Sequence, residues 1–260
     1  MIELEYLESV FFKVLADLKD YLDDLTLVGG WLPYVYSRFV WNNLVVKPIT
    51  TTDIDFGIGA DPSKVYSRTI FDLLSSKDYK ERHPQMDRMF PVVLYKEGKI
   101  RLDFIAPLKI ENKVIEQMVG KEIDINKIEK FDFLLKNRTL IEVKDKKMAY
   151  KVHCPKPSAF LYHKGATFTE REDEQKQAKD LHYMYFILRY TPDIETVLKE
   201  AGEYGRKGLL KEVSRNLDKY FSGKTGNGCL MVEKENGPDP YVSDLREDIF
   251  ERFKKLRESL

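Results

Sequence analysis

The chain has 260 residues, 43% of them hydrophobic, which predicts a packed globular protein and excludes disorder of the whole chain. Its 43 Lys and Arg residues are balanced by 43 Asp and Glu residues, which excludes a uniformly basic protein but allows a local basic patch. Two cysteines, Cys154 and Cys229, are too few for a disulfide framework or a cysteine zinc site. The acidic N-terminus and the lack of a long apolar run predict a cytoplasmic protein without a membrane span.

The first half of the chain is predicted to alternate helices and strands. Apolar side chains recur at steps of three and four over residues 2–22, as on one face of an amphipathic helix. A short strand at 25–28 stops at Gly29 and Gly30, and the aromatic segment from Trp31 to Trp41 is expected to form a buried helix. The elements expected next are a strand at 53–58, a helix from Asp61 to about Ser75, strands at 90–95 and 99–105 joined by a hairpin turn, and a strand near 139–143.

The second half is predicted to be helical after Pro155 and Pro157. Thr169 followed by Glu172 is typical of the start of a helix. Further helices are expected at 193–203, 207–221 and 241–258, with a Gly- and Asn-rich loop from Ser222 to Asp239. The chain is therefore predicted to be an α/β (α+β) protein, with a small mixed sheet flanked by helices in an α/β domain at 1–150 and a mainly helical domain at 151–260.

Two aspartates in one predicted strand, Asp53 and Asp55, are the main candidates for a functional site. Residues two apart in a strand share a face, so the carboxylates lie roughly 7 Å apart and repel each other unless a cation lies between them. Magnesium, or manganese, binds one or two such carboxylates together with substrate phosphates. Asp103, in the alternating segment Leu102-Asp103-Phe104, supplies a third carboxylate for a metal or for a proton. The alternative interpretation of Asp53-Ile54-Asp55 alone is an acidic strand end in solvent.

Gly29 and Gly30 lie between a predicted strand and a predicted helix. Glycines at this place allow the backbone to approach a phosphate closely. The chain has no Gly-x-Gly-x-x-Gly pattern and no Gly-Lys-Ser/Thr loop, so neither a dinucleotide fold nor a P-loop is indicated. An isolated pair of glycines is otherwise an ordinary turn.

Together these segments resemble the DNA polymerase β-like nucleotidyltransferase superfamily. The pattern of that superfamily is a hydrophobic residue with Gly-Gly, then Asp-hydrophobic-Asp, then a separate hydrophobic-Asp-hydrophobic strand. It matches Val28-Gly29-Gly30, Asp53-Ile54-Asp55 and Leu102-Asp103-Phe104, in that order. The chain departs from the common pattern because it has no arginine just before Asp53.

The resemblance extends to single-chain nucleotidyltransferases similar to the AbiEii toxins, which carry a Lys…Arg…Lys/Arg-Asp pattern after the sheet. Lys164, Arg171, Lys179 and Asp180 match this pattern, which implies that they bind the nucleotide together with Gly29 and Gly30. The alternative interpretation of these four residues is a solvated helix face.

A basic ridge is predicted on the helix at 207–221, since cations recur there at every fourth position. Its members are Lys207, Lys211, Arg215 and Lys219. The ridge is interpreted either as a contact surface for the phosphates of an RNA acceptor or as an ordinary solvent-facing side.

The resulting hypothesis is a magnesium-dependent nucleotidyltransferase that moves a nucleoside monophosphate from an NTP to an acceptor hydroxyl and releases pyrophosphate. Asp53, Asp55 and Asp103 would be its catalytic and metal-binding residues. Transfer RNA or another nucleic acid, a protein and a small molecule all stay open as acceptors, and the resemblance implies that an antitoxin could be a partner. The alternatives are a non-catalytic nucleotide- or nucleic-acid-binding protein on the same fold, and a glycosyltransferase that uses only the Asp-x-Asp pair.

Overall fold

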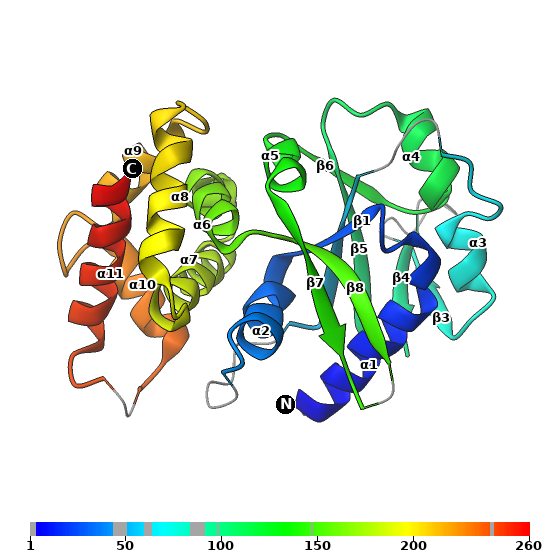
Figure 1. The fold of residues 1–260 in the computed structure, drawn as a ribbon, viewed down its shortest axis with the longest axis horizontal. Coiled ribbons are helices and arrows are strands. Elements are labelled where there is room, and N and C mark those ends of the chain that lie inside the picture. The colour runs from blue at the N-terminus through cyan, green and yellow to red at the C-terminus, as the bar shows by residue number, and fades with distance from the viewer. Residues whose placement is uncertain are drawn as a thin grey trace. The chain divides into compact units, whose positions relative to one another are not determined.

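The computed structural model describes residues 4–43, 51–59, 64–83, 92–97, 99–146, 148–239 and 242–260. The chain divides after Pro155 into two compact units, Met1–Pro155 and Lys156–Leu260. The first is built around a mixed β-sheet and the second is built of helices (Figure 1). This confirms the predicted fold class, a mixed α/β core followed by a helical half.

The first unit alternates helices and strands along the chain. Its α-helices are α1 (Leu4–Asp17), α2 (Leu32–Val35), α3 (Ile70–Ser75), α4 (Asn112–Val119) and α5 (Phe131–Lys136), with short 3-10 turns η1 (Lys19–Tyr21) and η2 (Gly29–Trp31) and a π-helical turn η3 (Tyr36–Val40). Its strands are β1 (Leu25–Val28), β2 (Asp53–Ile58), β3 (Tyr79–Arg82), β4 (Val93–Lys96), β5 (Ile100–Pro107), β6 (Ile125–Ile128), β7 (Arg138–Lys144) and β8 (Ala149–Pro155).

The sheet places β2 and β5 side by side near its centre. The strand order is β3-β4-β5-β2-β1-β8-β7, and β6 pairs with the second half of β5. β2 runs parallel to β5 and antiparallel to β1. Along β5 every second residue is buried, and the residues between them are half-exposed, so the sheet has one core face and one accessible face there.

The core face of the sheet is covered by apolar and aromatic side chains. Phe11 of α1 stacks on Trp31 with ring centroids 4.5 Å apart, and both side chains are fully buried. Phe56 and Phe104, from the neighbouring strands β2 and β5, stack at 6.3 Å. The amphipathic pattern of the first helix thus serves to cover this face of the sheet.

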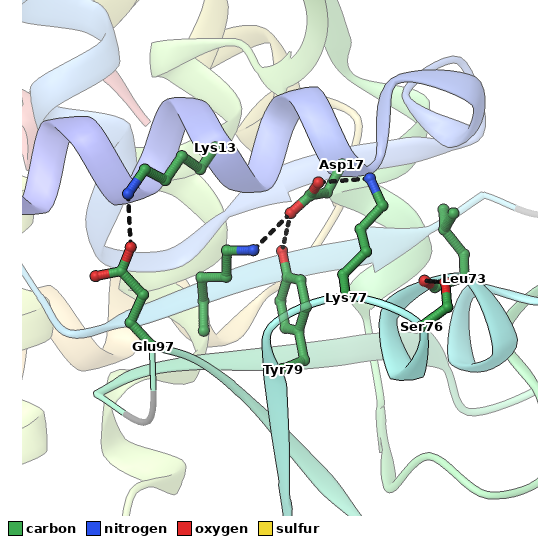
Figure 2. Close-up of polar contacts among 8 residues, drawn as sticks. Lys13, Asp17, Leu73, Ser76, Lys77, Tyr79 and Glu97 are labelled. Carbon is green, nitrogen blue, oxygen red and sulfur yellow. Dashed lines mark hydrogen bonds and ion pairs between the residues drawn. The ribbon is translucent and has the colours of Figure 1, made fainter.

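Polar contacts also fix α1 to the edge of the sheet, as Figure 2 shows around Asp17. The Asp17 carboxylate accepts hydrogen bonds from Lys77 Nζ at 2.6 Å, Tyr79 Oη at 3.0 Å and Lys96 Nζ at 3.0 Å. The Lys96 side chain is 8% exposed, and its ammonium lies 4.4 Å from the centroid of the Tyr79 ring. Burial opposes the charge of Asp17, but the hydrogen bonds from Lys77 and Lys96 hold its pKa below the usual range.

The second unit is a set of helices. They are α6 (Pro157–Thr167), η4 (Phe168–Glu170), α7 (Glu174–Tyr190), α8 (Ile194–Arg206), α9 (Glu212–Tyr220), α10 (Asn227–Asn236) and α11 (Leu245–Ser259). Phe221 and Phe253 stack at 3.7 Å in its core. In the parts of the chain that the structure describes, no helix combines the length and the apolar character needed to cross a bilayer.

Two predicted helix starts are wrong. The start at Asp61 falls on residues 60–63, outside the described ranges, but residues 64–69 are not helical. Helix α3 begins after Thr69, whose hydroxyl accepts from Asp72 N while the Asp72 carboxylate accepts from Thr69 N. The capping pattern at Thr169 is likewise not used, since Asp173 caps α7 instead.

The helix predicted over 207–221 is also interrupted. Gly208 and Leu210 both have positive φ, at +67° and +46°, which a helix does not allow. Helix α8 therefore ends at Arg206, and a separate helix, α9, begins at Glu212. Lys207 therefore caps the end of α8 and Lys211 precedes α9, so a continuous four-residue basic ridge does not form on one helix.

The loop predicted over 222–239 contains α10. Cys229 and Val232, three residues apart, are fully buried. Gly228 contributed to the loop prediction. In the structure it lies against the Phe221 ring, and a Cβ at this position would stand 2.5 Å from that ring. Close packing against Phe221 therefore explains why a glycine occurs inside α10.

Candidate functional site

Three aspartates of the first unit lie on two neighbouring strands of the sheet. Asp53 and Asp55 are on β2, and Asp103 is on β5. The parallel register of these strands pairs Asp55 with Asp103 and Asp53 with Arg101. All four side chains occupy half-exposed positions, and Asp55, Arg101 and Asp103 lie between buried neighbours. The structure thus brings the predicted carboxylates together on the accessible face.

Gly29 lies directly against the carboxylate of Asp55. The antiparallel register of β1 and β2 pairs Val28 with Asp55, so the turn after β1 passes next to that side chain. A Cβ at Gly29 would stand 2.0 Å from Asp55 Oδ2, and the φ of Gly29 is +71°. Only glycine meets both conditions without strain. The following residue, Gly30, is buried in η2.

Among the residues that the structure describes, the cation Arg101 lies within this group of carboxylates. Arg101 Nε donates to Asp103 Oδ1 at 2.7 Å, and the Arg101 side chain is 42% exposed. Burial raises the pKa of Asp103 above its usual range. The negative charges of Asp53 and Asp124 act in the same direction, while Arg101 opposes them. The described residues of the site therefore carry more negative than positive charge.

The donor set fits a hard divalent cation in its chemistry. Carboxylate oxygens on adjacent strands are the ligands that magnesium and manganese prefer. In the described residues, however, no three or more His, Cys, Asp and Glu side chains are grouped so as to hold a metal ion. Asp103 Oδ1 instead accepts from Arg101, so a three-carboxylate metal site would require Arg101 to move away from Asp103.

The sequence interpretation missed a fourth carboxylate, Asp124. It immediately precedes Ile125 of β6, and Ile125 pairs with Phe104, so Asp124 lies level with Asp103. Asp124 is exposed, and its negative charge helps to raise the pKa of Asp103. The signal was present in the sequence, because Ile123-Asp124-Ile125 has the same hydrophobic-Asp-hydrophobic pattern as the segment around Asp103.

Three of the four site residues predicted in the second unit, Lys164, Arg171 and Asp180, form a partly buried charged cluster. Asp180 of α7 accepts from Lys164 Nζ of α6 at 2.5 Å through Oδ1, and from Arg171 Nε at 3.2 Å through Oδ2. Its side chain is 8% exposed, and that of Lys164 is 11% exposed. Burial opposes the charge of Asp180, but Lys164 and Arg171 hold its pKa below the usual range. Lys179 lies outside the cluster, 5.9 Å from the centroid of the Tyr183 ring.

Lys164 lies in the last turn of α6, but its neighbour Gly165 does not end that helix. Helix α6 continues to Thr167. Gly165 allows close packing of α9, because a Cβ there would stand 2.9 Å from Val213 Cγ1. Lys164 is thus a buried ion-pair partner, while its role as a nucleotide ligand stays a prediction.

Comparison with known proteins places this arrangement in a family. The family model described as nucleotidyltransferase matches residues 11–201, which include every residue of the two clusters above. One similar solved structure is that of an antigenic nucleotidyltransferase-like protein from Paracoccidioides brasiliensis. It has 16% sequence identity and a TM-score of 0.43, over 82% of this chain and 94% of that chain. No curated protein matches the chain. By its match over most of its length, the chain belongs to the nucleotidyltransferase family.

Proposed function

We propose that the chain moves a nucleoside monophosphate from an NTP to an acceptor hydroxyl and releases pyrophosphate. The observation that supports this most directly is the register Val28–Asp55–Asp103, with the Gly29 backbone against Asp55. It places two carboxylates beside a turn that can approach a phosphate. A magnesium or manganese ion held by Asp53, Asp55 and Asp103 would supply the positive charge that offsets the phosphate charge in the transition state.

Residues of the first unit would have separate roles in the reaction. The acceptor oxygen bonds to the α-phosphorus, the bond from that phosphorus to the β-phosphate oxygen breaks, and Asp103 takes the hydroxyl proton. A carboxylate with a raised pKa is better suited to this task than an ordinary one. Arg101, which donates to Asp103 in this structure, would turn away from Asp103 when the metal ion binds. The Gly29 and Gly30 backbone would contact the triphosphate.

The second unit would contribute nucleotide contacts through the residues that the resemblance indicates. Lys164 and Arg171 are both held by one carboxylate, Asp180, which fixes two cations close to each other. Such a pair suits phosphate oxygens, and Lys179 would add a third positive charge.

The test is incubation with each α-labelled NTP and magnesium, with total RNA, a protein extract or aminoglycosides added separately. Label should enter one of these pools. Asp53→Asn should abolish transfer while leaving stability equal or higher, since it removes one of several crowded carboxylates. Asp78→Asn, at an exposed position outside the site, is the matched control and should retain full activity. Asp103→Asn should lower turnover by about 100-fold and leave Mg-NTP affinity within a few fold.

A second candidate is a nucleotide-binding protein without transfer activity. The observation that favours it is that the carboxylates, as placed, do not form a three-ligand metal group within the described residues. Thermal stabilisation by Mg-NTP with no labelled product in any pool would support it. The resemblance to AbiEii toxins further suggests a toxin restrained by an antitoxin. Growth arrest on expression that Asp53→Asn relieves would support that role.

A further inference from the structure

A row of paired residues crosses four strands on the accessible face of the sheet. The strand registers pair Asp53 with Arg101, Arg101 with Tyr95, and Tyr95 with Lys80. The row therefore runs from the carboxylates on β2 and β5 outward to β3, the edge strand. At roughly 4.8 Å per strand it spans about 14 Å.

The outer part of this row combines cations with an aromatic ring. The Arg82 guanidinium lies over the Tyr95 ring, 4.1 Å from its centroid. Lys80 and Arg82 are exposed and Tyr95 is half-exposed. Among the described residues, the Lys80 ammonium has no ion-pair partner. We call Lys80, Arg82, Tyr95 and Arg101 the edge patch.

The other face of the same strands is already occupied, which separates the edge patch from the α1 contacts. Tyr79 and Lys96 alternate with the edge-patch residues along β3 and β4, and both bond to Asp17 of α1. Figure 2 shows Tyr79 pointing toward Asp17. Because successive strand residues point to opposite faces, Lys80 and Tyr95 lie on the face away from α1.

We propose that the edge patch binds a single-stranded nucleic acid and leads its end toward Asp103. Its assignment as the acceptor rests on the proposed function, whereas the binding surface itself does not. Cations along a strand suit phosphates, and an accessible tyrosine next to an arginine suits the stacking of an unpaired base. A duplex keeps its bases stacked internally and offers no free face to Tyr95. Because the chain has no net charge, binding would depend on this local patch and not on the whole surface.

The test measures binding of a labelled single-stranded RNA of about 12 nucleotides by fluorescence anisotropy at several salt concentrations. Tyr95→Leu should weaken binding about 5- to 150-fold with an unchanged salt dependence, the range expected for one lost base stack. Tyr95→Phe keeps the ring and should bind like wild type. Lys80→Ala should lower the slope of log affinity against log salt by about 0.7. Lys144→Ala, at an exposed lysine on the opposite edge strand β7, is the matched control and should change neither quantity.

Several outcomes would overturn the inference. These are an absence of RNA binding, equal losses for the Lys80 and Lys144 variants, and binding of heparin as tightly as RNA with no effect of Tyr95→Leu. The last result would indicate a surface for polyanions in general.

The same experiment separates this inference from the proposed function. Label transfer to a protein or a small molecule without RNA binding would refute the edge patch and leave nucleotidyl transfer intact. RNA binding that depends on Tyr95, in a protein that transfers no label, would support the edge patch and refute the proposed reaction.

Discussion

Replacing Gly29 by alanine tests how closely the turn after β1 is fitted to the Asp55 carboxylate. Alanine at a φ of +71° costs about 1–2 kcal/mol in backbone strain. The new Cβ would also stand 2.0 Å from Asp55 Oδ2 and 2.8 Å from Asp55 Cγ, so the carboxylate must move, at about 1–3 kcal/mol. Gly29→Ala should therefore lower the free energy of unfolding of the first unit by about 2–5 kcal/mol, and it should displace a proposed metal ligand.

Two comparisons separate the strain from the clash. Gly237 has a φ of +67°, a ψ of −172° and nothing within 4 Å of its Cβ position, so Gly237→Ala should cost only backbone strain, about 1–3 kcal/mol. In an Asp55→Ala background the clashing oxygen and Cγ are absent and only the Cβ of residue 55 remains, at 3.2 Å, so Gly29→Ala should then cost little more than its backbone strain of about 1–2 kcal/mol.

Urea unfolding measures both effects. Tryptophan fluorescence reports on the first unit, because both tryptophans, Trp31 and Trp41, belong to it. Circular dichroism reports on both units, so the part of its change that does not coincide with the fluorescence transition follows the second unit, which contains Gly237. Equal costs of Gly29→Ala with and without the Asp55 carboxylate would refute the proposed contact.

Three further predictions concern the charged groups. Lys164→Met should lower stability by about 3 kcal/mol, because it removes the main partner of buried Asp180, and adding Asp180→Asn should restore most of that loss in urea unfolding followed by circular dichroism. Folding lowers the pKa of Asp17, so its ionised carboxylate stabilises the fold at pH values above its unfolded pKa near 3.9, and this stabilisation is lost as the pH falls through the lower folded pKa. In Asp17→Asn, the free energy of unfolding measured by fluorescence should therefore decrease less between about pH 4 and lower pH than in the wild type. Arg101→Gln should raise the pKa of Asp103 further, as measured by carboxyl NMR titration, and an unchanged pKa would contradict the ion pair.

The parts of the site that depend on local pattern could be predicted from the sequence. The period of two along a strand placed Asp53 and Asp55 on one face, and the alternation around Asp103 indicated its strand. The direct pairing of Asp55 with Asp103 follows from strand register. A single sequence does not determine this register, because it depends on how segments far apart in the chain align.

Other features could not be predicted because tertiary packing decides them. The edge patch exists only through the register of four strands, and β3 carries no clear alternation of its own in the sequence Tyr-Lys-Glu-Arg. From the sequence, Lys164 was interpreted either as a nucleotide-binding residue or as part of a solvated helix face. Its burial against Asp180 joins two helices, and helical spacing within either helix does not reveal such a contact. The glycine in α10 was misleading because the Phe221 ring, and not a turn, requires it.

The position of β8 has a consequence for the order in which the chain folds. β1, the strand that leads into Gly29, is flanked on one side by β2 and on the other by β8, the last element of the first unit. A ribosome must therefore produce nearly the whole first unit before β1 has both neighbours, and until then an apolar strand keeps an open edge. Such non-local pairing slows folding, whereas contacts between successive helices form early. The first unit is thus expected to depend more on protection from aggregation during synthesis than the second.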